Sequence, residues 1–217
     1  MDNVIFKNMM LFKPDVIGKY DIPIIKPLNE DILFEEAVCV NYYNTVKHKE
    51  NKLLHFYIDD YAFERFWINP TRYLDKISSF KYVLSPDFSL YTDMPKALSI
   101  YNHYRKHYLG AYWQSCGVKV IPTISWGDED SYEYCFDGEP VNSILSVSTL
   151  GSIKIKEYRK KFIEGFNEMI KRLNPHTIIL CGHLPSGIIY NGKIIPFKNF
   201  QLKNKVDIRN ERSFTEL

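Results

Sequence analysis

The feature that most constrains the fold is an alternation between short runs of consecutive apolar residues and longer stretches with helical spacing. The short runs are apolar at successive rather than alternate positions, as expected of strands covered on both faces. The six candidate strands are residues 35–43, 53–60, 81–87, 119–126, 142–149 and 176–182. Strands separated by helices predict an α/β domain with a mainly parallel sheet and alternating helices.

Three helical stretches lie between these strands. Residues 62–80 have helical spacing that is interrupted at Pro70, where the ring would clash with the preceding turn. A longer helix is expected to begin near Pro95 and to end at Gly117, with aromatic and aliphatic residues along one face. The third helix covers residues 153–173.

The region after the last candidate strand predicts a C-terminal β-hairpin. Residues 188–197 are largely apolar and contain Asn191-Gly192, a pair favoured in two-residue hairpin turns. With six candidate strands, two architectures fit the pattern. One is a partial or distorted (β/α) barrel, which is barrel-like without full closure, and the other is an open twisted sheet. The barrel-like arrangement is slightly favoured, although no internal repeat decides between the two.

The chain is expected to form one main domain. We expect an extended N-terminal arm over residues 1–30, a single α/β domain over 31–197, and a polar C-terminal tail over 198–217. No run of about 18 apolar residues occurs, and the first residues are too polar for a signal peptide, so we expect a cytoplasmic protein without a membrane partner.

Charge and cysteine content narrow the class further. The formal net charge of +2 gives no support for wholesale binding to nucleic acid or membranes. The four cysteines are widely spaced and form no C-x-x-C pair. Three of them lie in or beside apolar runs, which is typical of reduced, buried thiols.

The residues best suited to catalysis or ligand binding lie at the ends of the candidate strands. Parallel strands present their carboxyl ends at one edge of the sheet, where ligands bind. The candidate catalytic residues there are Asp59, Asp60, Asp87, Asp128 and His183. The candidate ligand-binding residues are Ser85, Asp93, Ser125, Trp126, Glu129, Ser148 and Thr149.

Clustered carboxylates at a sheet edge can do two kinds of chemistry. They can hold Mg²⁺ or Mn²⁺, or two of them can divide into an acid and a base when their surroundings separate their pKa values. The structural alternative is that acids after strands cap helices and accept hydrogen bonds from loop amides. Asp87, in the segment SPDFS, is the strongest functional candidate because a proline and aromatic residues flank it. Trp126 can stack on a base or sugar, or close the core.

Two other groups of residues fit solvent-exposed roles better. His103 and His107 share a helix face, but no H-E-x-x-H motif is present and basic residues lie between them, so solvated histidines are expected. The basic residues Lys154, Lys161 and Lys171 lie off the apolar stripe of their helix, which predicts a solvated outer face. Residues 198–212 are also basic. The alternative for both stretches is a surface that contacts phosphates.

Several chemical classes lose support because their motifs are absent. The sequence has no G-x-x-x-x-G-K-[ST] phosphate loop, no G-x-G-x-x-G fingerprint and no G-x-S-x-G elbow. No paired-cysteine zinc motif is present either.

Several short segments together resemble one known family. They are SPDFS (85–89), DMP (93–95), GAYWQS (110–115), VIPTISW (120–126), SVSTLG (146–151) and NPHTIILCG (174–182). Together they resemble a domain of unknown function found in proteins of phages, plasmids and integrative elements of low-GC Gram-positive bacteria. The similarity extends over about residues 30–197. It implies a mobile-element accessory protein, and it transfers no catalytic residues because no activity is assigned to the family.

Three functional hypotheses follow. The first is an enzyme with a carboxylate-lined site at the strand ends that acts on a nucleotide or nucleic acid. The second is a non-catalytic binding protein, either an inhibitor of a host factor or a nucleotide sponge. The third is a DNA-binding protein of replication or transfer, which rests on the basic stretches.

Overall fold

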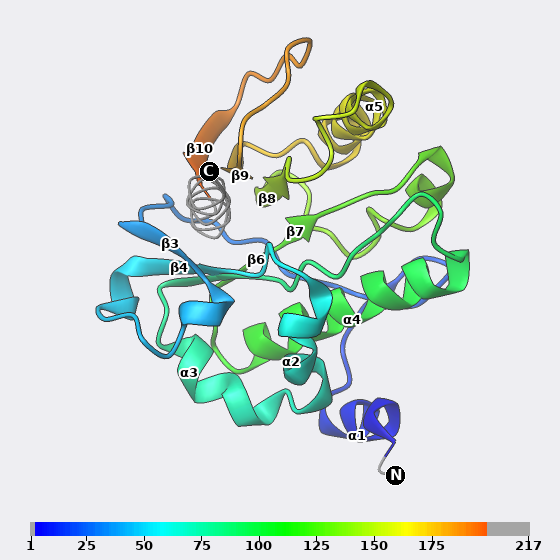
Figure 1. The fold of residues 1–217 in the computed structure, drawn as a ribbon. Coiled ribbons are helices and arrows are strands. Elements are labelled where there is room, and N and C mark those ends of the chain that lie inside the picture. The colour runs from blue at the N-terminus through cyan, green and yellow to red at the C-terminus, as the bar shows by residue number, and fades with distance from the viewer. Residues whose placement is uncertain (1–2, 199–217) are drawn as a thin grey trace, which may run out of the picture.

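The structure, a computed structural model, describes residues 3–198 and centres on two parallel four-stranded sheets (Figure 1). The first sheet contains, in spatial order, β3 (Glu36–Cys39), β4 (Lys52–His55), β5 (Tyr82–Leu84) and β6 (Val120–Ile121). The second contains β7 (Thr123–Ile124), β8 (Ile144–Ser148), β9 (Thr177–Cys181) and β10 (Lys193–Phe197). Within each sheet the spatial order follows the order along the chain, which confirms the predicted mainly parallel α/β arrangement.

A proline divides one extended segment between the two sheets. Residues 119–126 were expected as a single strand, but β6 and β7 are separated by Pro122, which has no N–H to give to a ladder. The carbonyl of Pro122 still accepts a hydrogen bond from Ser146 N of β8 at 2.8 Å. The chain therefore passes directly from one sheet into the other.

The strands are covered on both faces, as the sequence pattern predicts. Leu54 of β4 packs in the cluster that lies under α4, whereas its neighbour Leu53 belongs to an inner apolar cluster. That inner cluster collects side chains from both sheets, including Leu84, Ile121, Ile144 and Ile179. Because one cluster joins both sheets, the core runs continuously across the break at Pro122.

The strand array is open. The edge strands β3 and β10 are not hydrogen-bonded to each other within the described residues, although Phe197 of β10 contacts the ring of His55 of β4 at a centroid distance of 5.1 Å. No closed barrel forms among residues 3–198, so the structure supports the open twisted sheet of the two predicted architectures.

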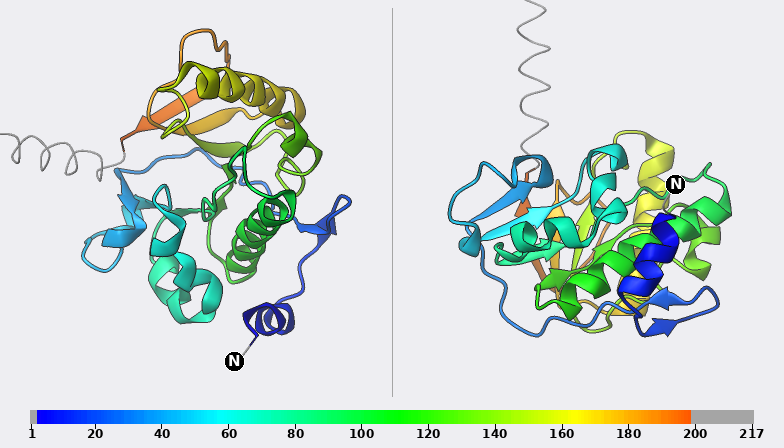
Figure 2. Two further views of the ribbon diagram at one scale, coloured as in Figure 1. Left: turned by 45° about the vertical axis from the view of Figure 1, so that its right-hand side comes forward. Right: turned by 90° about the horizontal axis from the view of Figure 1, so that it is seen from below.

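Two long helices cover the two sheets. Helix α4 (Lys96–Ser115) packs with α2 (Glu64–Ile68) and α3 (Leu74–Ser78) on the first sheet, while α5 (Lys156–Leu173) packs on the second (Figure 2). Gly117 ends α4 as expected, with a positive φ of 84° and its N–H bonded to the carbonyl of Gln114. Short 3-10 turns lie at Val40–Tyr42, Lys49–Asn51, Asp60–Ala62, Thr71–Tyr73 and Glu129–Glu133.

The N-terminal region is not simply an extended arm. It contains helix α1 (Val4–Leu11) and a small antiparallel pair, β1 (Val16–Ile17) with β2 (Ile22–Pro23). Asn3 caps α1 by accepting a hydrogen bond from Ile5 N at 3.1 Å. The helix was missed because most of its apolar residues face outward rather than along a buried stripe.

The predicted C-terminal hairpin is wrong. Residues 193–197 form β10, which pairs in parallel with β9 instead of folding back on residues 188–190. The hydroxyl of Tyr190 donates to the carbonyl of Pro175 at 2.9 Å, which holds the connecting segment against the preceding loop. Parallel pairing of β10 with β9 is therefore preferred over the local hairpin that Asn191-Gly192 favours. Beyond Lys198, the predicted polar tail lies outside the described residues.

Among the described residues, no helix is both long enough and apolar enough to cross a lipid bilayer.

The close contact between Gly165 of α5 and Trp126, which follows β7, can be tested by substitution. An ideal Cβ at Gly165 would lie 2.2 Å from Trp126 Nε1. In an unhindered helix, Gly→Ala stabilises by about 1 kcal/mol, but here the added methyl group must displace the indole ring. We expect Gly165→Ala to lower the free energy of unfolding by about 1 to 3 kcal/mol, the usual cost of overpacking, as measured by urea denaturation.

The exposed Asn167 on the same helix provides a matched control. Asn167→Ala should be neutral or slightly stabilising, because Ala has the higher helix propensity and nothing is crowded. A stabilised Gly165→Ala variant would contradict the close packing of Trp126 on α5.

Candidate functional site

A pocket of about 810 Å³ opens at the carboxyl ends of β5, β7 and β8. Its walls come from the loops that follow these strands and from the first turns of α5. The sequence-predicted residues that line it are Asp87, Asp93, Ser125, Trp126 and Ser148. This position matches the edge at which parallel sheets bind ligands.

The other predicted site residues do not line this pocket. Asp59, Glu129 and His183 are exposed, and the backbone carbonyl of Asp128 accepts a hydrogen bond from Ser131 Oγ at 2.6 Å. Thr149 is buried, where its hydroxyl accepts a hydrogen bond from His183 N at 3.2 Å. The carboxylates were therefore not brought together as one rim.

Two further predicted residues hold the loop that carries Asp87. The carboxylate of Asp60 accepts hydrogen bonds from Ser89 N at 3.1 Å and from Ser89 Oγ at 2.8 Å. Ser85 is buried, and its hydroxyl accepts a hydrogen bond from Thr123 N at 2.9 Å. These contacts tie the loop after β5 to its neighbours, so Asp60 and Ser85 act as positioning residues for Asp87.

Asp87 has the electrostatics of an acid–base group. It lines the pocket, and burial raises its pKa to about 7. The nearby charge of Lys106 opposes this rise, and Asp60 adds to it. A carboxyl group that titrates near neutral pH can both accept and give a proton under physiological conditions. Asp87 also contributes to a raised pKa of Tyr57, after the larger effect of burial.

Trp126 and Ser125 form one wall of the pocket. The Trp126 ring packs against Phe162 of α5 at a centroid distance of 5.3 Å, so it is part of the second-sheet core as well as of the wall. The hydroxyl of Ser125 is buried and has no hydrogen-bond partner among the described residues. At the end of the neighbouring strand β8, Ser148 Oγ accepts a hydrogen bond from Leu150 N at 3.2 Å.

Lys161 differs from the other basic residues of α5. Lys160 and Lys171 are highly exposed, with side-chain exposures of 78% and 76%, and both pair with glutamates one turn away. Lys161 has a side-chain exposure of 33% and lines the pocket, where its ammonium group lies 3.9 Å from Glu157. The predicted solvated position therefore holds for Lys154 and Lys171, which are exposed, whereas Lys161 faces the pocket.

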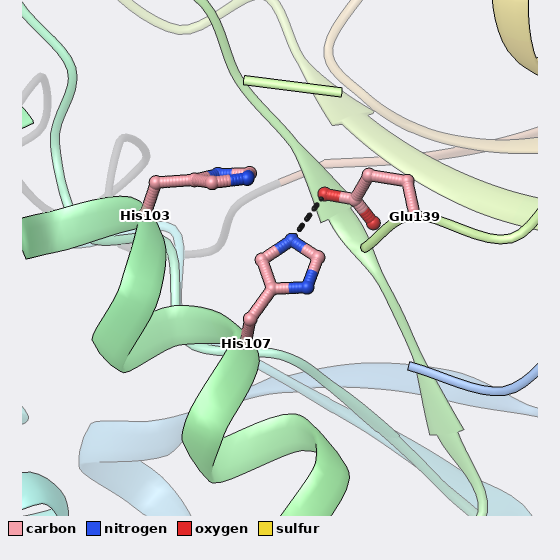
Figure 3. Close-up of side chains that lie close together, drawn as sticks. All are labelled: His103, His107 and Glu139. Carbon is pink, nitrogen blue, oxygen red and sulfur yellow. Dashed lines mark hydrogen bonds and ion pairs between the residues drawn. The ribbon is translucent and has the colours of Figure 1, made fainter. Parts of the chain in front are cut away.

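The expectation of solvated histidines at 103 and 107 is wrong. His103 and His107 of α4 lie beside Glu139 from the loop before β8 (Figure 3). All three residues are buried, and so is Lys106 of α4. Lys106 Nζ and His107 Nε2 lie 2.8 and 2.9 Å from Glu139 Oε1. Burial lowers the pKa of His107, against the opposing influence of Glu139.

The reason for this error is that a loop distant in sequence covers the polar face of α4. The loop carrying Glu139 packs on that face, and His107 Nδ1 lies 2.8 Å from the carbonyl of Pro23 in β2. The spacing H-x-x-x-H was visible in the sequence. No local signal indicated that Glu139 would complete the group.

Comparison with known proteins places the chain in a phage-associated family. A family model described as a domain of unknown function, DUF4417, matches residues 15–200. The chain belongs to the DUF4417 family. No solved structure is detectably similar to it.

Two curated relatives of this DUF4417 chain are phage proteins. The "Gene 1 protein" of Mycobacterium phage L5 is 38% identical over 165 residues, which cover 76% of this chain and 72% of that protein. The "Gene 1 protein" of Mycobacterium phage D29 is 37% identical over 172 residues, covering 76% of this chain and 61% of that protein. These relatives support the phage-type family. They do not support a restriction to low-GC Gram-positive hosts, because mycobacteriophages are GC-rich.

The raised pKa of Asp87 predicts a specific pH dependence of stability. Folding raises this pKa from the ordinary value of 3.8 to about 7, so the folded state holds the proton more tightly. The resulting stabilisation is complete below about pH 4 and is lost as the pH rises through 7. Relative to Asp87→Asn, the wild-type free energy of unfolding should fall by up to about 4 kcal/mol between pH 4 and 8, at about 1.4 kcal/mol per pKa unit.

Denaturation by urea at several pH values measures this difference. Asp59→Asn is the matched control, because Asp59 is exposed and lies outside the pocket. Its stability profile should run parallel to that of the wild type. Parallel profiles for Asp87→Asn and the wild type would show that Asp87 is an ordinary solvated carboxylate.

Proposed function

We propose that this DUF4417 protein is a phage-type accessory enzyme whose catalytic pocket acts on a nucleotide or nucleic acid. The observation that carries the proposal is Asp87, with a pKa of about 7, in a pocket of about 810 Å³ at the carboxyl ends of parallel strands. Enzymes use such groups as general acids and bases because their protonation state changes near the working pH.

The pocket lining supports a substrate with both an aromatic ring and a phosphate. Tyr91, Trp126 and Tyr158 offer aromatic surfaces on which a base can stack. Lys161 offers a cation at the pocket wall. The phage origin of the relatives agrees with a substrate from nucleic-acid metabolism.

The start of α5 is a suitable place for the phosphate. The helix begins at Lys156, and its N-cap residue, Ile155, provides no side-chain hydrogen bond to the first turn. Gly151 and Ser152, in the loop before it, line the pocket. Uncapped backbone N–H groups at a helix N-terminus favour an anion, and Lys161 lies one to two turns further along.

The chemistry that fits this arrangement is hydrolysis of a phosphoester. Asp87 would take a proton from water as the water oxygen bonds to phosphorus and the bond to the leaving oxygen breaks. Mg²⁺ in such sites is often held by one or two carboxylates together with the substrate phosphates. Asp93 could provide such a carboxylate, which would leave Asp87 free to act as the base.

The alternative functions do not require Asp87 to act as an acid or base. A non-catalytic nucleotide sponge would use the same pocket without acid–base chemistry, and an inhibitor of a host factor would need a protein partner instead. The proposed DNA-binding role rests partly on the basic residues near the C-terminus, most of which lie outside the described residues.

Replacement of Asp87 separates an enzyme from a sponge. Asp87→Asn should lower kcat/KM for phosphate release by about 100- to 10,000-fold, the usual contribution of a general base, while nucleotide binding is retained. Wild-type activity should fall on the acid side of about pH 7, where Asp87 is protonated. Thermal-shift and turnover assays over a nucleotide panel, with and without Mg²⁺ or Mn²⁺, provide the measurements.

Asp59→Asn should leave turnover unchanged because Asp59 does not line the pocket. If the wild type binds a nucleotide but turns over none of the panel, the sponge replaces the enzyme as the better hypothesis.

A pair of neighbouring lysines tests the phosphate position. Lys161→Gln should weaken nucleotide binding by about tenfold or more, because it removes a hydrogen bond to a charged group, and should reduce its salt dependence. Lys160→Gln should change neither property, since Lys160 is exposed and outside the pocket. Equal effects of the two substitutions in titration calorimetry would argue against a phosphate beside Lys161.

A further inference from the structure

We propose that His103, His107 and Glu139 form a binding site for one divalent transition-metal ion of the Zn²⁺ class. Two imidazoles and a carboxylate are a common ligand set for such ions. The three residues are buried, and one ligand atom from each lies within 4.8 Å of the others. In Figure 3, both histidines project from α4 toward Glu139.

The orientation of each imidazole agrees with metal ligation. His103 Nε2 lies 3.0 Å from the carbonyl of Asp137, and His107 Nδ1 lies 2.8 Å from the carbonyl of Pro23. A carbonyl only accepts hydrogen bonds, so these two nitrogens carry the ring protons. The remaining nitrogens, Nδ1 of His103 and Nε2 of His107, then offer lone pairs to a metal, and His107 Nε2 lies 2.9 Å from Glu139 Oε1. Metal-binding histidines are typically fixed in this way by a carbonyl on the other ring nitrogen.

Two buried atoms in the group lack the partner that a metal would supply. His103 Nδ1 and Glu139 Oε2 have no hydrogen-bond partner within residues 3–198. Both are acceptors, so they cannot satisfy each other. Buried polar atoms without partners are rare enough in proteins to require an explanation. A cation between them satisfies both at once.

The present distances bracket those of a metal site. His107 Nε2 lies 2.9 Å from Oε1 of the same carboxylate whose Oε2 has no partner, and one ligand atom from each of the three residues lies within 4.8 Å of the others. Ligands about 2.1 Å from a tetrahedral ion are about 3.4 Å from one another. Adjustments of about 1 Å in side-chain positions would close the site. A metal-bound imidazole nitrogen carries no proton, so His107 would bind the ion through a deprotonated Nε2.

Lys106 limits which ion can bind and how tightly. Its ammonium group donates to Glu139 Oε1 and to the carbonyl of Thr123, both at 2.8 Å. This leaves Oε2 for the ion, but the positive charge opposes any cation. Mg²⁺ and Ca²⁺ prefer several oxygen ligands and find only one carboxylate here, whereas imidazole nitrogens suit Zn²⁺.

The proposed metal would cross-link elements that are distant in sequence. It would join α4 to the loop that carries Glu139, and the carbonyl of Pro23 would orient His107 from β2. None of the three ligands lines the pocket that contains Asp87. The metal proposal therefore stands independently of the proposed enzymatic function.

Two substitutions remove one ligand atom each while keeping the outer hydrogen bond. In His103→Gln, the amide nitrogen can replace Nε2 as donor to Asp137, and no atom replaces Nδ1. In His107→Asn, the amide nitrogen can replace Nδ1 as donor to Pro23, and no atom replaces Nε2. His183→Gln and Cys116→Ser serve as controls, because both residues are exposed and lie outside the proposed metal site.

The experiment measures Zn²⁺ binding to the full chain after EDTA treatment and dialysis, by elemental analysis, competition titration and thermal shift. The wild type and both controls should bind one Zn²⁺ per chain and melt at a higher temperature with it, and Mg²⁺ should have no such effect. Each ligand variant should bind Zn²⁺ more than about 100-fold more weakly, since even the loss of an outer hydrogen bond to a ligand commonly costs 10- to 100-fold.

Two results would overturn the proposal. One is a folded wild type that takes up no stoichiometric Zn²⁺. The other is a His103→Gln variant that binds Zn²⁺ with wild-type affinity. That result would show that His103 Nδ1 is not a metal ligand and that this side chain only packs in the interior beside α4. Asp87→Asn should retain Zn²⁺ binding, so failure of the pocket hypothesis and failure of the metal hypothesis remain distinguishable.

Discussion

The buried ammonium group of Lys106 connects the parts of the molecule that carry both candidate sites. A charge that is 1% exposed requires compensation, and Lys106 obtains it from Glu139 and from the carbonyl of Thr123. Thr123 leads directly into Ser125 and Trp126 of the pocket wall. The same charge moderates the pKa of Asp87. A single side chain of α4 therefore holds the loop before β8 and the first residue of β7, and it influences the electrostatics of the pocket.

The fold was largely predictable because its strands are covered on both faces. Continuous apolar runs such as residues 176–182 indicate buried parallel strands without any knowledge of their partners. The division of residues 119–126 at Pro122 was harder to predict, because both halves are extended and apolar. Local preference also failed at Asn191-Gly192, where pairing of β10 with the free edge of β9 prevailed over the turn. Long-range pairing, not local pattern, decides such cases.

The predicted residues that line the pocket mostly follow their strands closely, and Asp93, nine residues beyond β5, is the exception. Asp87 and Ser125 come within three residues of β5 and β7, and they line the pocket. Asp59 lies four residues beyond β4, next to a 3-10 turn that leaves it exposed. His183 follows Gly182, whose φ of 104° redirects the chain. Beyond the first few residues, loop conformation determines which way a side chain points.

The buried group on α4 was invisible for a different reason. A helix face that carries His103, Lys106 and His107 has the composition of a solvated surface. Only the packing of a loop more than thirty residues away makes it interior. Sequence periodicity reports which residues are apolar, and it cannot report which polar residues a distant segment will cover.

An open parallel sheet leaves two edges at which another chain could add a strand, and β10 shows how one of them is protected. Lys193 N donates to His176 and Phe197 accepts from Gly182 N, so the odd-numbered residues of β10 bond toward β9. The even-numbered residues therefore point their backbone groups outward, and one of them is Pro196. Its missing N–H removes a donor from the free edge, as proline commonly does on edge strands. Pro196 therefore leaves the hydrogen bonds between β10 and β9 intact. On the outward-facing edge of β10, it makes pairing with a strand of another chain less favourable.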